Sequence, residues 1–152
     1  MTQNMTQADR IPTEAQEQQT LFRWAALQQG ARPELSLLYH VPNEGNRGVI
    51  GGVKAQREGL KKGVPDLCLP VSRGGYHGLY IELKRQQGAY PTEEQVWWLE
   101  QLSRNGYCVC WCRGWKEAQT VIMDYLKMGE ITYSPMRGRG GMYHAGGTND
   151  GR

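Results

Sequence analysis

Two apolar segments joined by an amphipathic one constrain the fold of this chain most. GLYIELK (residues 78–84) and YCVCWCR (residues 107–113) have the length and apolar pattern of strands. The segment between them, TEEQVWWLEQLSRN, predicts a helix that begins at Thr92 and stops at Gly106. A strand–helix–strand unit of this length predicts a right-handed parallel crossover, because parallel strands need a long connection.

The remaining segments predict an α/β domain in the order α-β-(α)-β-β-α-β-α, with a mixed sheet flanked by helices. A first helix is capped by Thr13 and ended by Gly30. LCLPV (residues 67–71) is expected to form an antiparallel hairpin with residues 78–84. Residues 115–128 form the last predicted helix.

Two segments are less clear in their pattern. ELSLLYHV (residues 34–41) fits a strand or a helix, and we expect a strand because Pro33 and Pro42 bracket it at strand length. KAQREGLKK (residues 54–62) predicts a short basic helix that Gly63 closes.

Length and composition indicate one globular domain, since the 152 residues are 39% hydrophobic and 22% charged. We expect this domain over residues 13–130, after a disordered lead (1–12) and before a disordered Gly/Arg-rich tail (131–152). No apolar run reaches the ~18 residues that span a bilayer, and the first residues contain no signal-peptide apolar segment. We therefore expect a cytoplasmic protein with no membrane partner. A net charge of +3 permits nucleic acid as a partner without requiring it.

The predicted hairpin carries three charged residues, Asp66, Glu82 and Lys84. Asp66 and Glu82 are equidistant from Gly74 in the predicted turn, so a symmetric hairpin places the two carboxylates opposite each other. Like charges in this position repel unless a cation lies between them. Lys84 shares a strand face with Glu82, because alternate residues of a strand project from the same side.

Such a cluster predicts a divalent-metal site. Mg²⁺ binds through one or two carboxylates, keeps several waters and accepts substrate phosphate, while a nearby ammonium stabilises charge on that phosphate. An alternative is purely structural, because Glu-x-Lys also arises by chance and Asp66 could simply begin a strand.

The four cysteines are Cys68, Cys108, Cys110 and Cys112. The last three alternate and so point the same way on a strand, and they lack the C-x₂₋₄-C turns of zinc sites. We expect reduced thiols along a strand face; a zinc or redox protein that uses these thiols is the alternative.

Beyond the single motif, several segments in order resemble the virus-type replication-repair nuclease (VRR-NUC) domain of the PD-(D/E)xK superfamily. They are HVPNEG, then GVPDL and GLYIELKR, then PTEEQVWWLEQLSRNGYCVCWCRGWKEA, after a helix that carries Glu. The resemblance extends from about Thr13 to Leu126. It implies a restriction-endonuclease-like α/β fold with an α-β-β-β-α-β-α core, and hydrolysis of DNA phosphodiesters.

The resemblance also implies roles for individual residues. Asp66, Glu82 and the backbone carbonyl of Leu83 would bind Mg²⁺ or Mn²⁺, and Lys84 would assist hydrolysis. It further implies a homodimer that needs no small-molecule cofactor and cuts Holliday junctions or other branched DNA in replication, recombination or repair, as in phage and bacterial members. The alternative function is a non-catalytic nucleic-acid-binding module on the same fold.

Other positions have weaker assignments. The family places an acidic residue on the first helix facing the metal, and Glu14 and Glu17 both satisfy this by their spacing; Glu14 could instead interact with the helix dipole. Gln95 matches a family glutamine but also completes a capping box with Thr92.

The remaining assigned residues concern DNA. His40 and Asn43 fall in the family's HxPN segment near the active site, although His40 could be a structural hydrogen-bonding residue. A basic stretch is expected to contact the phosphate backbone or to form a solvated face: Lys54, Arg57, Lys61 and Lys62.

Overall fold

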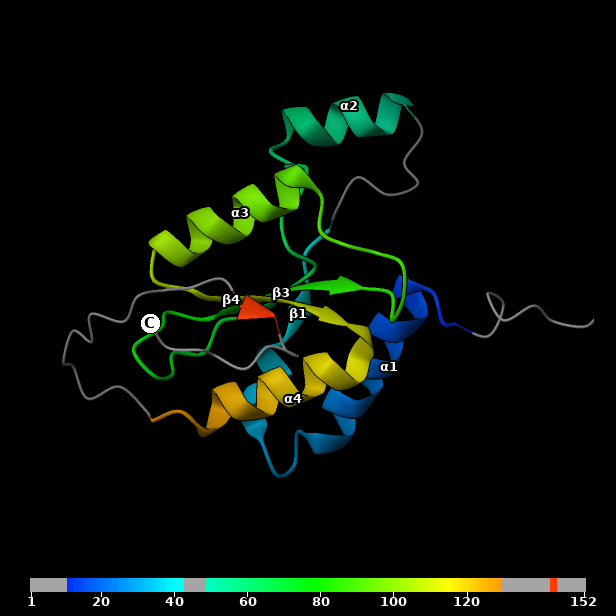
Figure 1. Ribbon diagram of the computed structural model, residues 1–152. Coiled ribbons are helices and arrows are strands. Elements are labelled where there is room, and N and C mark those ends of the chain that lie inside the picture. The colour runs from blue at the N-terminus through cyan, green and yellow to red at the C-terminus, as the bar shows by residue number, and fades with distance from the viewer. Residues whose placement is uncertain (1–10, 43–48, 130–142, 145–152) are drawn as a thin grey trace, which may run out of the picture.

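The computed structural model describes residues 11–42, 49–129 and 143–144 (Figure 1). Its centre is a mixed five-stranded sheet in the order β1-β2-β3-β4-β5. The neighbours β1–β2 and β2–β3 are antiparallel, whereas β3–β4 and β4–β5 are parallel. The strands are β1 (Tyr39–His40), β2 (Leu67–Leu69), β3 (Leu79–Lys84), β4 (Cys108–Arg113) and β5 (Tyr143–His144).

Helices cover both faces of this sheet. They are α1 (Glu14–Gln28), the 3₁₀ helix η2 (Pro33–Leu37), α2 (Val49–Arg57), α3 (Glu93–Arg104) and α4 (Gly114–Lys127). α1 and α4 lie together on one face, and α3 lies on the other, connecting β3 to β4 (Figure 1). The expected α/β architecture and its parallel crossover are confirmed.

The hairpin has the predicted register. Leu67 pairs with Ile81 and Leu69 with Leu79, so the pairs are centred on Gly74. Continuing this register by one residue beyond β2 sets Asp66 opposite Glu82, as expected for a symmetric hairpin. An isolated bridge between Arg73 and Tyr76 closes the turn.

The hydrophobic core lies between the sheet and the α1–α4 layer. Ile81 and Leu83 of β3 enter it together with Cys110 and Cys112 of β4, and all four side chains are almost fully buried. Since strand residues alternate, Glu82 and Lys84 must project from the other face. The core thus fixes the strand that carries the charged residues.

The expected strand over residues 34–41 is wrong for most of its length. Residues Pro33–Leu37 form the 3₁₀ helix η2, and only Tyr39–His40 pair with β2. Pro33 has no amide donor and a fixed φ suited to a first helical turn. The hydroxyl of Ser36 donates to the Pro33 carbonyl at 2.7 Å. Leu35 of η2 is buried in the hydrophobic core.

The basic helix is also displaced from its predicted position. It ends at Arg57 rather than at Gly63, because Gly59 adopts a φ of 102° that L side chains avoid. The amide of Leu60 then donates to the Ala55 carbonyl at 2.9 Å and closes the helix end.

The ends of the chain differ in part from the expected disorder. Tyr143–His144 form strand β5 beside β4, so these two residues depart from the predicted tail. Residues 1–10, 130–142 and 145–152 lie outside the described residues. Within the described part of the chain, no helix has the length and apolarity needed to cross a bilayer.

Two leucines of α1 test the core directly. Leu21 is fully buried, whereas Leu27 is 79% exposed on the same helix. We expect Leu21→Ala to lower the free energy of unfolding by about 2–5 kcal/mol, because it leaves a cavity. Leu27→Ala should change it by less than about 0.5 kcal/mol. Urea denaturation measures both, and equal losses would contradict the packing described above.

Candidate active site

Asp66, Glu82 and Lys84 converge at one end of the β2–β3 hairpin. The ammonium Nζ of Lys84 lies 3.1 Å from Oε1 of Glu82, and both side chains are largely buried. The backbone amide of Leu83 donates to Oδ2 of Asp66 at 2.7 Å. This last bond joins the residue before β2 to β3. The backbone of β3 thus fixes the carboxylate of Asp66 next to Glu82, which β3 itself carries.

Burial dominates the electrostatics of this cluster. It raises the pKa of Glu82 to about 8, and the neighbouring charge of Asp66 adds to the effect, while Lys84 opposes it. Burial also raises the pKa of Asp66, against the opposing effects of the Leu83 amide and Lys84. The two carboxyl groups therefore resist being ionised together unless further positive charge is present.

The donor set fits a divalent cation. Oε2 of Glu82 is buried and has no hydrogen-bond partner among the described residues. A buried carboxylate oxygen without a partner is costly. The described residues contain no group of three or more His, Cys, Asp or Glu side chains that could hold a metal. A cation here would therefore depend on the two carboxylates and on the backbone. Two carboxylates and a backbone carbonyl suit Mg²⁺ or Mn²⁺, because Mg²⁺ keeps several of its waters.

A pocket of about 240 Å³ opens beside Asp66. Leu83 lines it, which is consistent with a role for its backbone. The other lining residues come from the start of α1 and from β1: Glu14, Ala15, Gln18 and His40. The site is thus open to solvent on the side of α1.

The structure separates the two glutamates of α1. Glu14 is exposed and lines the pocket, where its charge acts on Asp66. Glu17 is 1% exposed, and both of its carboxylate oxygens are engaged. Oε1 accepts from Gln86 Nε2 at 2.7 Å, and Oε2 accepts from the Trp115 amide at 2.8 Å. Glu17 therefore binds the start of α4, and Glu14 is the helix carboxylate that faces the pocket.

His40 lies near the site and also has a structural contact. Its Nδ1 is 3.0 Å from the Asp66 carbonyl, which also accepts from the Val41 amide at 2.7 Å. His40 thus helps to fix the backbone that carries Asp66. Asn43 lies outside the described residues.

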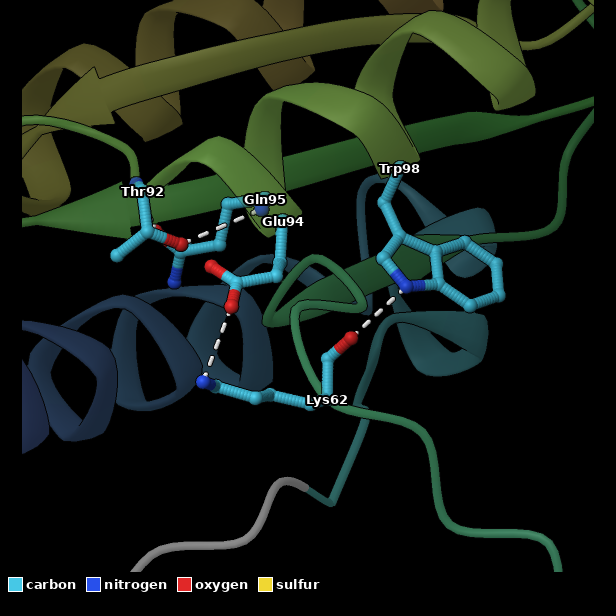
Figure 2. Close-up of polar contacts among 5 residues, drawn as sticks. All are labelled: Lys62, Thr92, Glu94, Gln95 and Trp98. Atoms are coloured by element: carbon cyan, nitrogen blue, oxygen red, sulfur yellow. Dashed lines mark hydrogen bonds and ion pairs between the residues drawn. The ribbon is translucent and has the colours of Figure 1, made fainter.

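Residues of the first two turns of α3 contact Lys62, and Gln95 lies in the first of these turns (Figure 2). Neither Lys62 nor Gln95 lines the pocket beside Asp66. Lys62 Nζ lies 3.0 Å from Oε1 of Glu94, and the Lys62 carbonyl accepts from Trp98 Nε1 at 2.9 Å. Oε1 of Gln95 accepts from the Thr92 amide at 2.8 Å, which completes the predicted capping box. Gln95 thus has the helix-capping role that its spacing from Thr92 predicts.

The other residues of the basic stretch are solvent-exposed. Lys54 and Arg57 lie in the last turn of α2, and Lys61 follows in the loop toward Asp66. Lys54 is 3.8 Å from Glu58 in an exposed ion pair, which contributes little to stability. Exposure leaves these cations accessible to a polyanion.

Sequence reasoning missed two residues that support the site, Gln86 and Trp98. Gln86 holds Glu17, and Trp98 holds the backbone that leads to Asp66. Neither contact has a local sequence signal, because each joins residues far apart in the chain. Gly114, with a φ of 81°, permits the approach of Glu17: an added Cβ would lie 3.3 Å from Oε2.

The cysteines occupy the core and not a metal site. Cys110 and Cys112 are buried with their Sγ atoms 3.8 Å apart. The bond to Cys112 and burial raise the pKa of Cys110 well above its usual range, and burial raises the pKa of Cys108 to about 11. Among the described residues no group of three or more His, Cys, Asp or Glu includes these thiols in an arrangement that could hold zinc, so the zinc alternative finds no support.

The raised pKa of Glu82 predicts a pH dependence of stability without metal. Between the ordinary value of 4.5 and about 8, the folded protein keeps a proton on Glu82 that the unfolded chain has released. The free energy of unfolding should therefore fall as the pH rises through this window, by on the order of a few kcal/mol. Urea denaturation in EDTA at several pH values measures it.

Two controls sharpen this measurement. Glu82→Gln should flatten the slope, whereas Glu100→Gln, at an exposed position of α3, should preserve it. Mg²⁺ bound through Glu82 would stabilise the protein more at pH 8 than at pH 5, because a carboxyl group must lose its proton to bind a metal. Identical slopes for the wild type and Glu82→Gln would show that Glu82 is not the titrating group.

Adjacent tryptophans test the support of the Asp66 loop. Trp98→Phe removes the donor to the Lys62 carbonyl and should cost about 1 kcal/mol. Amide exchange over residues 59–66 should then accelerate, as measured by hydrogen–deuterium exchange. Trp97→Phe is the matched control, because Trp97 is 54% exposed on the same helix. Equal acceleration in both variants would exclude the Trp98 bond as the cause.

Comparison with known proteins gives the family. A profile of the VRR-NUC domain matches residues 4–116. No match is found among curated proteins. Two chains of solved structures match, and one of them, titled "VRR_NUC domain protein", has a TM-score of 0.69 and 33% sequence identity over 80% of this chain and 93% of its own. Both matches cover most of the chain, and the chain carries an Asp–Glu–Lys cluster on its mixed sheet. The chain therefore belongs to the VRR-NUC domain family.

Proposed function

We propose that this protein is a metal-dependent endonuclease that hydrolyses DNA phosphodiester bonds. The observation that carries the proposal is the buried Glu82 with the half-buried Asp66 and the Lys84 ammonium beside it. Two carboxylates that resist joint ionisation suit a site completed by a divalent cation. Membership of a nuclease-type family supports the reaction class.

Asp66, Glu82 and the Leu83 carbonyl would hold Mg²⁺ or Mn²⁺. When bound, the cation supplies Lewis-acid stabilisation of phosphate charge and makes a water molecule more acidic. Lys84 is oriented by its 3.1 Å contact with Glu82. From there its ammonium stabilises the negative charge that develops on the phosphate during hydrolysis. Glu14 adds a carboxylate to the opposite wall of the pocket, where it can accept a hydrogen bond from the attacking water.

The substrate would be DNA, in branched form such as a Holliday junction, and the enzyme a homodimer acting in the cytoplasm during replication, recombination or repair. Exposed cations in α2 and in the loop before Asp66 support contact with the phosphate backbone. Four free cysteines are consistent with a reducing compartment. A homodimer suits a four-way junction, because both have two-fold symmetry.

A cleavage panel tests this function. Linear, flap, splayed and four-way DNA are incubated with the protein and Mg²⁺, Mn²⁺ or EDTA, and products are resolved on gels. Cleavage is expected only with metal and most rapidly on branched DNA. Asp66→Asn and Glu82→Gln should each lower the rate by about 100-fold or more, since each removes a carboxylate ligand of the cation that stabilises the transition state.

Lys84 provides the sharpest variant of the panel. Lys84→Ala should reduce turnover at least about 100-fold while DNA affinity changes less than about threefold, because its charge acts mainly in the transition state. Lys127→Ala, at an exposed position of α4, is the matched control and should retain full turnover. Tight DNA binding without cleavage of any substrate would instead support the non-catalytic binding module.

A further inference from the structure

The sheet places a second group of side chains beside the Asp–Glu–Lys cluster. In the parallel pair of β3 and β4, Glu82 is in register with Trp111 and Lys84 with Arg113. Residues in register on neighbouring strands project from the same face, and neighbouring strands lie ~4.8 Å apart. Trp111 and Arg113 therefore extend the face of the active site by one strand.

A tyrosine from the loop before α3 completes this group. The Tyr90 ring lies 5.8 Å from the Trp111 ring, and the guanidinium carbon of Arg113 lies 4.7 Å from the Tyr90 centroid and 5.0 Å from that of Trp111. We refer to Tyr90, Trp111 and Arg113 as the aromatic–arginine cluster. Its parts come from β4 and from the β3–α3 connection, beside the strand that carries Glu82 and Lys84.

Two members of this cluster have environments that are unusual for their residue types, the ring of Tyr90 and the guanidinium of Arg113. Tyr90 is 68% exposed, although aromatic rings are usually buried to a large extent. Nε of Arg113 is buried and has no hydrogen-bond partner among the described residues. The guanidinium stacks on the two rings, and no ion pair with a carboxylate is found for it in the described part of the chain. Among the residues that the structure describes, an exposed ring and a cation without a carboxylate ion pair thus lie together.

This combination matches the chemistry of one nucleotide. A nucleobase stacks on an exposed aromatic face whatever its sequence, and a guanidinium binds phosphate through paired N–H donors. Packing against a protein partner would suit the ring, but it would leave the arginine charge without a counterion. Duplex DNA would suit the charge, but its stacked bases could not reach the ring.

We propose that the aromatic–arginine cluster binds an unpaired nucleotide next to the scissile phosphate, with the base on the Tyr90 ring and its phosphate on Arg113. The proposal rests on the nuclease function above and names the form of DNA that the site accepts. It gives a physical source of structure selectivity: a nucleotide beside a branch point or a frayed end can leave its stack at low cost, whereas one inside a duplex cannot.

The test couples a protein change to a DNA change and needs no cleavage. Short single strands, each with an abasic site at a different position, are titrated against the protein in EDTA, and affinity is measured by fluorescence anisotropy. For the wild type, removal of one base should weaken binding about tenfold. Tyr90→Ala should bind the intact strand about tenfold more weakly and should lose nothing further when that base is absent. Tyr90→Phe should behave as the wild type.

Two further variants complete the design. Trp97→Ala removes an exposed ring on α3 and should keep the full abasic penalty. Arg113→Gln should reduce the slope of log affinity against log salt by about 1, as expected for one lost phosphate contact. Thermal unfolding of each variant confirms that the fold is retained.

The outcomes separate the two proposals. Equal abasic penalties in the wild type and Tyr90→Ala, or no DNA binding at all, would overturn the nucleotide subsite, even if the enzyme cuts DNA. The expected coupling without any metal-dependent cleavage would sustain the subsite and overturn the nuclease function. Coupling together with cleavage supports both.

Discussion

The burial of one carboxylate, Glu82, is the constraint on which the site depends. An isolated buried charge is strongly unfavourable, so the surrounding structure must compensate for it. Lys84 supplies a cation at 3.1 Å, and Asp66 is held close by the Leu83 amide. The compensation is incomplete, because Oε2 of Glu82 keeps no partner among the described residues. The fold thus tolerates a buried carboxylate oxygen that the described residues leave without a hydrogen bond.

The same strand carries the hydrophobic core and the chemistry. Ile81 and Leu83 are buried against α1 and α4, which fixes β3 in position and rotation. The side chains of Glu82 and Lys84, which alternate with these two, must therefore project from the opposite face of the sheet. Helix ends provide the remaining support: Glu17 holds the start of α4, and Trp98 holds the loop before Asp66. Long-range hydrogen bonds thus position the carboxylates more than local sequence does.

The separation along the chain of the residues in contact explains which features could be predicted from the sequence. Symmetry about Gly74 predicted the hairpin register, because a strand pairing is determined once its turn is located. Glu14 and Glu17 could not be separated, since helical spacing puts both on one face and only the distant Gln86 and Trp115 engage Glu17. The leucine-rich segment after Pro33 was predicted as strand, because its pattern fits both structures and tertiary packing decided between them.

Electrostatics connects the metal site to the proposed nucleotide subsite. Near neutral pH and without a cation, Glu82 keeps a proton and the charge of Asp66 offsets that of Lys84, so the region has no net positive charge to attract a phosphate. A divalent cation held by Asp66 and Glu82 would make this region net positive, and Arg113 lies one strand away from it. Metal and DNA should therefore bind with positive coupling, and linkage requires that each raises the affinity of the other by the same factor. On this account DNA would bind more weakly before the cation is present, and one charge change would raise both the affinity for DNA and the readiness for hydrolysis.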